Sequence, residues 1–364
     1  MKRFSLLTCL LFFLLNIPSS AQDFNWNFYQ ETYNKATTAF PLGNEKWLVG
    51  IQALSDSYIG PKIAVIHMVD STGSIWSDTN ENRIPERCRV ESFLRLGDKI
   101  FVLIRKNSNS YILSYLLKES SMEFVNMIEF EDRILIDKIE SLPNGKIIGI
   151  GSDLRTPSSY GYWTVISQDL IQEYEDFSYL GRLNDFILLE DSTFLLGGAF
   201  EDTIDYGMKK FNLNYNQLES FLPNIFPYRV LQTDNKDLFI TINRKIQKLN
   251  SSFEIDTTIF LTNFEILIDV KQDGNRLYAY GIDYDNIRKI MEFDNNLSLV
   301  DSHLIDIPNF SEHGIEIQND TFIIVGDHTL NIPDQGVPYS YPKITASFYS
   351  YSKNETPSFS NNNL

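Results

Sequence analysis

The sequence predicts an all-β protein that folds as a β-propeller with four strands in each blade. One sequence pattern recurs seven times between residues 38 and 326: an apolar strand, a tight polar turn, and a second apolar strand. The turns follow one another at intervals of 38 to 54 residues, a spacing typical of propeller blades. No 11-residue window keeps a 3.6-residue apolar period with proper caps, so helices are not expected. Seven blades fit best, and six or eight remain open.

Each unit opens with a hairpin whose turn is a short Gly, Asn or Asp pair, as in Ile139–Ile150. Such pairs supply the positive φ angles that two-residue hairpins need. The second strand after each turn is almost continuously apolar, as expected for a strand buried on both faces. The predicted turns are Gly43-Asn44, Gly97-Asp98, Asn144-Gly145, Asp191-Ser192, Asn235-Lys236, Asp273-Gly274 and Asn319-Asp320.

The second half of each unit alternates polar and apolar residues, as in Tyr162–Ser167 followed by Ile171–Glu175. One exposed and one packed face suits strands further from the propeller axis. A closed ring also needs a seam between its first and last blades. The aromatic segment Phe24–Tyr29 precedes the first unit and is predicted to add the outermost strand of the last blade.

The two ends of the chain are expected to lie outside the propeller. Residues 1–21 resemble a secretory signal peptide, with Lys2 and Arg3 before the apolar stretch Leu6–Leu15 and small residues before a cut at Gln22. No later segment carries 18 uninterrupted apolar residues, so no transmembrane segment is expected. The propeller is assigned to residues 22–352, and residues 353–364 are assigned to a polar disordered tail or linker.

Charge and cysteine content limit the function classes. The net charge is −17, which argues against nucleic acid because phosphate binding needs a basic surface. Cys88 is the only cysteine left once Cys9 departs with the signal peptide, so no internal disulfide can form. The fold must therefore be held by its apolar core.

The stretch Val69–Trp76 resembles the strand–turn–strand of quinoprotein and kelch-like propellers, with an Asp, a Thr-Gly turn and a docking Trp. It occurs once, so the cofactor chemistry of such enzymes is not carried over. More broadly, the chain resembles the secreted propellers of unknown function common in Bacteroidota. That resemblance covers residues 22–352 and implies export to the periplasm, the cell surface or the medium.

Candidate ligand-binding residues lie where second strands end, on the face that also carries the connections between blades. Propeller ligands usually bind on this face near the axis. Aspartates there could bind Ca²⁺, serve as an acid/base pair on a sugar, or merely cap the following turn. Tyrosines there could stack on a glycan or peptide. The candidates are Asp153, Tyr160, Asp202, Tyr206, Asp283, Tyr284, Asp327, His328 and Tyr339.

Motifs of established chemistry are missing from the sequence. The histidines have no metal-ligand spacing, and no nucleophile elbow, P-loop or dinucleotide fingerprint occurs. His67 lies in an apolar run and is predicted to be a core residue, and no catalytic residue is assigned.

Three functions therefore remain open. The favoured hypothesis is a secreted or surface-exposed, non-enzymatic propeller that binds a glycan, peptide or surface protein through its loop-rich face. The alternatives are a glycan-active hydrolase or lyase that uses channel-mouth carboxylates, and a structural module of a larger exported protein. No cofactor is assigned, with Ca²⁺ as the one candidate ion.

Overall fold

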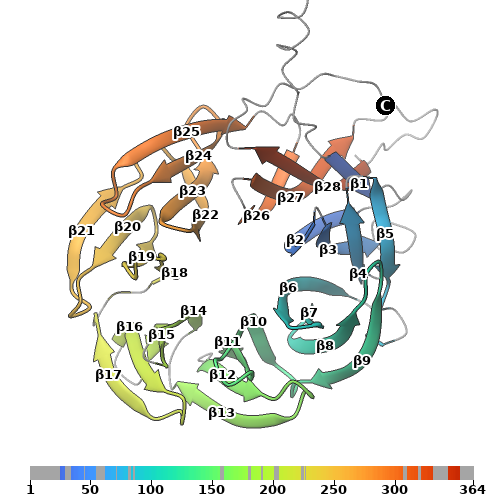
Figure 1. Cartoon of the computed structure of the whole chain (residues 1–364), viewed down its shortest axis with the longest axis horizontal. Helices are drawn as coiled ribbons and strands as arrows, with labels where there is room; N and C mark the ends of the chain where they lie inside the picture. The colour runs from blue at the N-terminus through green and yellow to red at the C-terminus, as the bar shows by residue number, and fades with distance from the viewer. Residues whose placement is uncertain are drawn as a thin grey trace, which may run out of the picture.

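A computed structural model of the chain shows seven four-stranded antiparallel sheets arranged as blades around a central channel (Figure 1). Six sheets are built from four consecutive strands, and the seventh combines three consecutive strands with the N-terminal one. The prediction of an all-β propeller is confirmed. The structure describes residues 25–28, 34–44, 46–54, 62–70, 72–80, 83–84, 87–155, 160–178, 182–189, 192–200, 205–222, 225, 227–305, 310–318, 321–330 and 343–352.

Within each of the first six blades the strands run in chain order from the channel outward. Blade 1 contains β2 (Asn34–Gly43), β3 (Lys46–Leu54), β4 (Lys62–Asp70) and β5 (Gly73–Asp78). Blade 2 contains β6 (Cys88–Leu96), β7 (Lys99–Lys106), β8 (Asn109–Leu117) and β9 (Met122–Glu129). Blade 3 contains β10 (Ile134–Ser141), β11 (Ile147–Asp153), β12 (Tyr160–Ile166) and β13 (Gln172–Ser178).

The later blades repeat this order. Blade 4 contains β14 (Leu183–Leu188), β15 (Thr193–Phe200), β16 (Asp205–Asn212) and β17 (Gln217–Phe221). Blade 5 contains β18 (Arg229–Gln232), β19 (Leu238–Ile242), β20 (Lys245–Leu249) and β21 (Ile255–Phe260). Blade 6 contains β22 (Ile266–Asp273), β23 (Arg276–Ile282), β24 (Arg288–Phe293) and β25 (Leu299–Ile305).

Blade 7 closes the ring with both ends of the chain. It contains β26 (Phe310–Gln318), β27 (Thr321–Leu330) and β28 (Lys343–Ser352), and β1 (Asn25–Phe28) pairs antiparallel with β28 as its outermost strand. Asn25 lies opposite Tyr349 and Phe28 opposite Ala346. The predicted seam is confirmed, and β1 covers the outer edge of β28, which would otherwise be unpaired.

The predicted turns connect the first and second strands of their blades wherever the structure describes them. Gly97 (φ 63°) and Gly274 (φ 58°) adopt the left-handed conformation that costs glycine least. Ser192 (φ 59°) and Lys236 (φ 69°) adopt it as well, in longer turns closed by backbone hydrogen bonds. The turn at Asn319-Asp320 lies outside the described residues.

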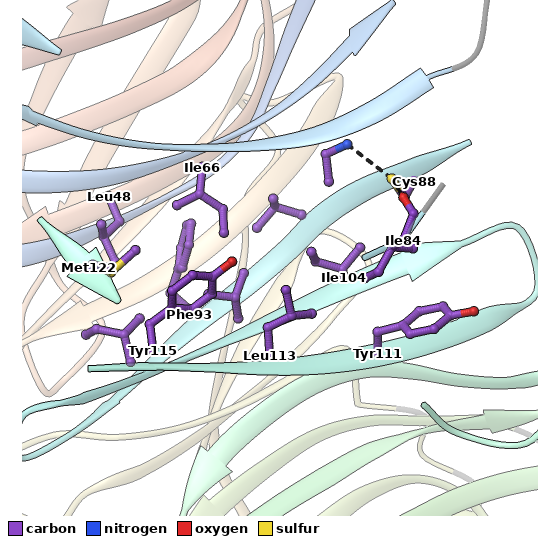
Figure 2. Close-up of a cluster of buried hydrophobic side chains, with 14 of the residues drawn as sticks. Leu48, Ile66, Ile84, Cys88, Phe93, Ile104, Tyr111, Leu113, Tyr115 and Met122 are labelled. Atoms are coloured by element: carbon purple, nitrogen blue, oxygen red, sulfur yellow. Dashed lines mark hydrogen bonds between the residues drawn. The ribbon is translucent and has the colours of Figure 1, made fainter. Parts of the chain in front are cut away.

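Apolar side chains fill the space between neighbouring blades. Between blades 1 and 2, for example, Leu48 and Ile66 pack with Leu113 and Tyr115 (Figure 2). The predicted docking residue Trp76 takes part, since its ring meets Tyr115 edge-on at 6.1 Å between centroids. Burial of these side chains is the main stabilising contribution to the fold.

The innermost strands share one irregularity. The pairing register with the second strand shifts by one residue in β2, β6, β10, β14, β22 and β26, which is the signature of a β-bulge. The extra residues include Glu91, Asp137 and Asn184. A bulge turns the neighbouring side chains out of the regular alternation, and here it directs polar groups towards the channel.

Candidate functional site

The channel holds a cavity of about 560 Å³, lined by side chains of the innermost strands. Six cationic and six anionic residues lie along or directly behind this lining. They form inter-blade and intra-blade ion pairs, which we call the charge belt. Its members are Arg89, Glu91, Arg105, Asp137, Lys138, Glu140, Arg182, Asp185, Arg229, Asp269, Lys271 and Glu316.

Asp185 joins three blades within the belt. One of its carboxylate oxygens accepts from Lys138 Nζ of blade 3 at 2.6 Å and from the Phe186 backbone at 2.9 Å. The other accepts from the Val230 backbone of blade 5 at 2.8 Å. Its side chain is only 1% exposed, so these protein groups replace water as its hydrogen-bond partners.

Asp269 has the same role between blades 5 and 6. It accepts from Arg229 Nε at 2.9 Å and from the Val270 backbone at 2.9 Å. Burial opposes its ionisation, but Lys271 and Arg229 outweigh that effect and hold the pKa of Asp269 below its ordinary value. Lys271 in turn pairs with Glu316 of blade 7 at 2.8 Å. Asp269 therefore stays ionised at neutral pH, and the ion pairs of the belt join neighbouring blades around the channel.

A second cavity of about 510 Å³ lies at one end of the channel, between blades 4 and 6. It shares Asp137, Arg182 and Arg229 with the channel lining, so it is the mouth of the channel. Tyr228 and Arg244 also line it. Tyr228 immediately precedes the first strand of blade 5, and Arg244 lies between its second and third strands. The mouth therefore opens on the face that carries the inter-blade connections, which we call the connector face.

Exposed apolar side chains also lie on the connector face of blades 5 and 6, from Tyr228 at this mouth out to Phe260 and Leu304 on the outermost strands. Half of the twelve large apolar residues that are exposed in the described part of the chain lie on the connector face of blades 5 and 6. The ends of strands and the loops that carry them place all six on the same face, because successive strands are antiparallel. This group, called the rim patch, consists of Tyr228, Phe260, Ile266, Tyr284, Ile287 and Leu304.

Two of the predicted aspartates cap their own turns. Asp153 ends β11 and accepts from the Arg155 backbone at 2.9 Å and from its guanidinium at 2.8 Å. Burial opposes ionisation of Asp153, but the hydrogen bonds from Arg155 outweigh it and lower its pKa. Asp283 accepts from the Asp285 and Ile287 backbones, and its hydrogen bond from Lys289 lowers its pKa. Both carboxylates thus act as local turn caps.

The predicted tyrosines fall into different settings. Tyr160 begins β12 opposite Asp153, so it is partly buried at a strand end rather than in an open loop. Tyr206 lies in β16, opposite Ala199. Tyr284 is 62% exposed and belongs to the rim patch. It is the one predicted candidate that the structure places in that patch.

The expectation that the second strand of the last blade ends at Asp327 and His328 is wrong. Both belong to β27, which continues to Leu330, and their backbones pair on both sides, with β26 and β28. The apolar residues of β27 end before the strand does. The polar residues that follow them continue the backbone pairing with β26 and β28. Asp202 and Tyr339 lie outside the described residues.

Within the described ranges, no three His, Cys, Asp or Glu side chains are grouped so that they could hold a metal ion. Over the same ranges, no helix has the length and apolarity needed to cross a membrane. The calcium hypothesis stays a prediction.

Sequence reasoning missed the charge belt, Arg244 and most of the rim patch. One signal was present, since a charged residue recurs in the first strand of four successive units, at Lys138, Asp185, Arg229 and Asp269. These residues meet only after the ring closes. Tyr228, Phe260 and Ile266 carry no local sequence pattern that would group them.

Two further titratable groups are buried in blades 1 and 2. Cys88 Sγ accepts from the Ala64 backbone at 3.1 Å, and burial raises the pKa of its thiol (Figure 2). His67 is 5% exposed, as predicted for a core residue, and its Nδ1 lies 2.8 Å from Ser74 Oγ. Burial lowers the pKa of His67 to about 4.

This buried imidazole predicts a loss of stability at mildly acidic pH. Its folded pKa of about 4 lies below the ordinary 6.5, so the unfolded chain binds the proton first. His67 should therefore cost the fold up to about 3 kcal/mol as pH falls from 6.5 to 4. Urea unfolding at a series of pH values should show this slope in the native chain and a shallower one in His67→Gln. An equal slope in both proteins would contradict the assignment.

Comparisons with known proteins support the fold and leave the activity open. No protein-family model matches the chain, and no curated protein matches it. Among solved structures, Sqt1 from Chaetomium thermophilum has a TM-score of 0.57 at 10% identity, covering 90% of this chain and 97% of that one. The Dos1 propeller has a TM-score of 0.56 at 10% identity, with coverages of 91% and 96%. A protein of unknown function from Bacteroides caccae has a TM-score of 0.46 at 10% identity, covering 75% and 94%. At this identity the likeness to the Dos1 propeller shows that the chain has the fold of a known β-propeller.

Proposed function

We propose that this chain is an exported, non-enzymatic β-propeller that binds a peptide or protein partner on its connector face. The observation that carries the proposal is the rim patch beside the channel mouth. Its aromatic side chains, together with the neighbouring arginine, are of the kinds that dominate binding energy at protein interfaces. An apolar group of this kind on one face indicates an interaction site.

The composition of the patch favours a polypeptide over a sugar. Ile266, Ile287 and Leu304 are 53%, 41% and 52% exposed and offer aliphatic surface beside the rings of Phe260 and Tyr284. Packing of apolar peptide side chains against these aliphatic side chains would bury apolar surface and stabilise the complex. A glycan would use mainly the ring faces and polar groups. A glycan partner is retained as an outcome of the test.

The setting of the predicted carboxylates favours binding over hydrolysis. Asp153 and Asp283 lie on blades 3 and 6, and each is held by the cation and backbone amides of its own turn. A general acid needs a raised pKa, whereas the pKa values of both groups are lowered. These two aspartates thus support a role in shaping the face.

Export is the second part of the proposal and rests on the sequence of residues 1–21, which lie outside the described residues. The proposed final location is the periplasm, the cell surface or the medium. Expression in a Gram-negative host followed by N-terminal sequencing should find a chain that begins at Gln22 outside the cytoplasm. A cytoplasmic chain that keeps Met1 would contradict it.

A peptide-display experiment tests the binding face. A phage-displayed random 12-residue library and a glycan array are applied to the native chain and to Tyr228→Ala/Phe260→Ala/Tyr284→Ala, with Ca²⁺ and with chelator. The control is Val125→Ala/Ile171→Ala/Leu218→Ala, which removes equally exposed apolar side chains from outer strands. Selected peptides should bind the native and control proteins and bind the patch variant at least about tenfold more weakly. Enrichment of no peptide, or equal binding by the patch variant, would overturn the proposal.

A further inference from the structure

We infer that Arg244 recognises a carboxylate in the bound polypeptide, next to an apolar side chain that rests on the rim patch; this inference rests on the proposed function. The partner would then be a segment with one Asp or Glu beside an aromatic or aliphatic residue. Four features of the channel mouth lead to this chemistry.

Arg244 is positioned by neutral groups. Its Nη1 donates to the Phe264 carbonyl at 2.8 Å and to the Tyr284 hydroxyl at 2.7 Å. Neither oxygen carries a charge. Over the described part of the chain, no carboxylate oxygen lies within 4.0 Å of this exposed guanidinium. Its charge is therefore not neutralised by a direct ion pair.

The other two arginines at the mouth are already neutralised. Arg182 pairs with Asp137 at 3.0 Å, and Arg229 pairs with Asp269 at 2.9 Å. Glu265 also lines the mouth and is exposed, so it supplies one negative charge to the region without forming an ion pair within the described residues. Among these three arginines, Arg244 is thus the one whose guanidinium can still bind a carboxylate.

The geometry of the guanidinium suits a bidentate ligand. Both of its hydrogen bonds use Nη1, which leaves Nε and Nη2 to bind the two oxygens of a carboxylate in parallel. Such fork-shaped pairing is the reason that arginine is favoured for carboxylate recognition. The two existing bonds fix the side chain in advance, which reduces the entropy lost on binding.

The hydrogen bond between Arg244 and Tyr284 also places an exposed aromatic side chain next to the guanidinium. Tyr284 accepts from Arg244 through its hydroxyl, while its side chain stays 62% exposed. Phe260, also 62% exposed, is held by Lys245 Nζ at 5.0 Å from its ring centroid. A peptide residue that lies over the Tyr284 ring would put a neighbouring acidic side chain within reach of Arg244.

The net charge of the chain limits how many acidic residues the bound segment can carry. At −17 the protein repels a long acidic segment, so attraction to Arg244 acts only at short range. A single carboxylate in an otherwise apolar or neutral stretch satisfies both conditions.

Selected peptides and a double-mutant cycle test the inference. The most enriched 12-residue peptide is labelled with fluorescein, and its Kd is measured by anisotropy on the native chain, Arg244→Ala, Arg244→Lys and the control Arg133→Ala, an exposed arginine on blade 3. Arg244→Ala should raise the Kd about 10- to 100-fold, Arg244→Lys less, and Arg133→Ala not at all. Replacing the peptide's acidic residue with its amide should weaken binding to the native chain and leave Arg244→Ala unaffected. Melting temperatures confirm that the variants are folded.

The outcomes separate this inference from the proposal it rests on. Peptides that lack an acidic residue, or a Kd that Arg244→Ala leaves unchanged, would overturn the role of Arg244 while leaving the rim patch as the binding face. Failure of every peptide to bind would overturn the proposed function itself.

Discussion

Replacing Asp185 with alanine is expected to lower the free energy of unfolding by about 2 to 4 kcal/mol, because the change takes the partner from a half-buried ammonium and the acceptor from a buried backbone amide. Lys138 would lose its 2.6 Å ion pair, and the Val230 amide would lose its 2.8 Å acceptor. Burial opposes the charge of Lys138, and Asp185 is the nearer of the two carboxylates that offset this and raise its pKa. Urea unfolding followed by tryptophan fluorescence measures the loss.

Removing both charges provides the control. The double variant Lys138→Met/Asp185→Leu has no orphaned ammonium, so it should recover at least half of the loss caused by Asp185→Ala. The glutamate beside Lys138, Glu140, is 40% exposed and can be hydrated after the change. A double variant as unstable as the single one would show that the belt acts through packing rather than through charge.

The propeller was predictable because its determinants are local. A hairpin turn with the right residues between two apolar runs specifies the first two strands of a blade without reference to the rest of the chain. Seven such repeats in succession then specify a ring of blades. Even the seam was visible, since Phe24–Tyr29 was a strand-like segment with no partner of its own, and Asn25–Phe28 does pair with β28.

The charge belt was not predictable because it depends on two non-local facts. A bulge in the first strand decides which side chain faces the channel, and a bulge depends on how two strands pair rather than on composition. Lys138 and Asp185 lie far apart in the sequence and meet only when blades 3 and 4 pack together. Sequence reasoning therefore identified strands with charged residues but could not pair those charges.

The candidate site was predicted only in part for the same reason. The rule that an aspartate follows the second strand located Asp153 and Asp283 correctly, but their side chains turned back to cap local turns. Tyr284 was found because it stands in one of those loops. Arg244 comes from blade 5 and meets Tyr284 in the loop of blade 6 only when the two blades pack together, which no single unit encodes.

Replacing Gly151 with alanine is expected to destabilise the fold by about 3 kcal/mol or more. A Cβ at this buried position of β11 would overlap the backbone carbonyl oxygen of Leu135 in β10 and lie 2.9 Å from the carbonyl carbon. Backbone atoms cannot move aside as a side-chain rotamer can, so the two strands would have to separate. Urea unfolding of the native chain and of Gly151→Ala measures this difference in the free energy of unfolding.

The cause of the clash is the bulge itself. Gly151 pairs with the residue just before the register shift in β10, and Gly198 and Gly281 hold the same position in blades 4 and 6. At both, an added Cβ would likewise meet a carbonyl oxygen of the first strand. Blade 7 carries Gly326 at this position, whereas blades 1 and 2 carry Ile51 and Ile104.

Gly149 supplies a matched control two residues away in the same strand. A Cβ there would meet only the methyl carbons of Ile136 and Thr164 at 3.3 Å, and these side chains can yield by a few tenths of an ångström. Gly149→Ala should therefore cost about 1 kcal/mol or less. Equal losses at the two positions would mean that β11 tolerates no added volume anywhere. A loss confined to Gly151 would show that the bulge that directs the charge belt into the channel also dictates the glycine beside it.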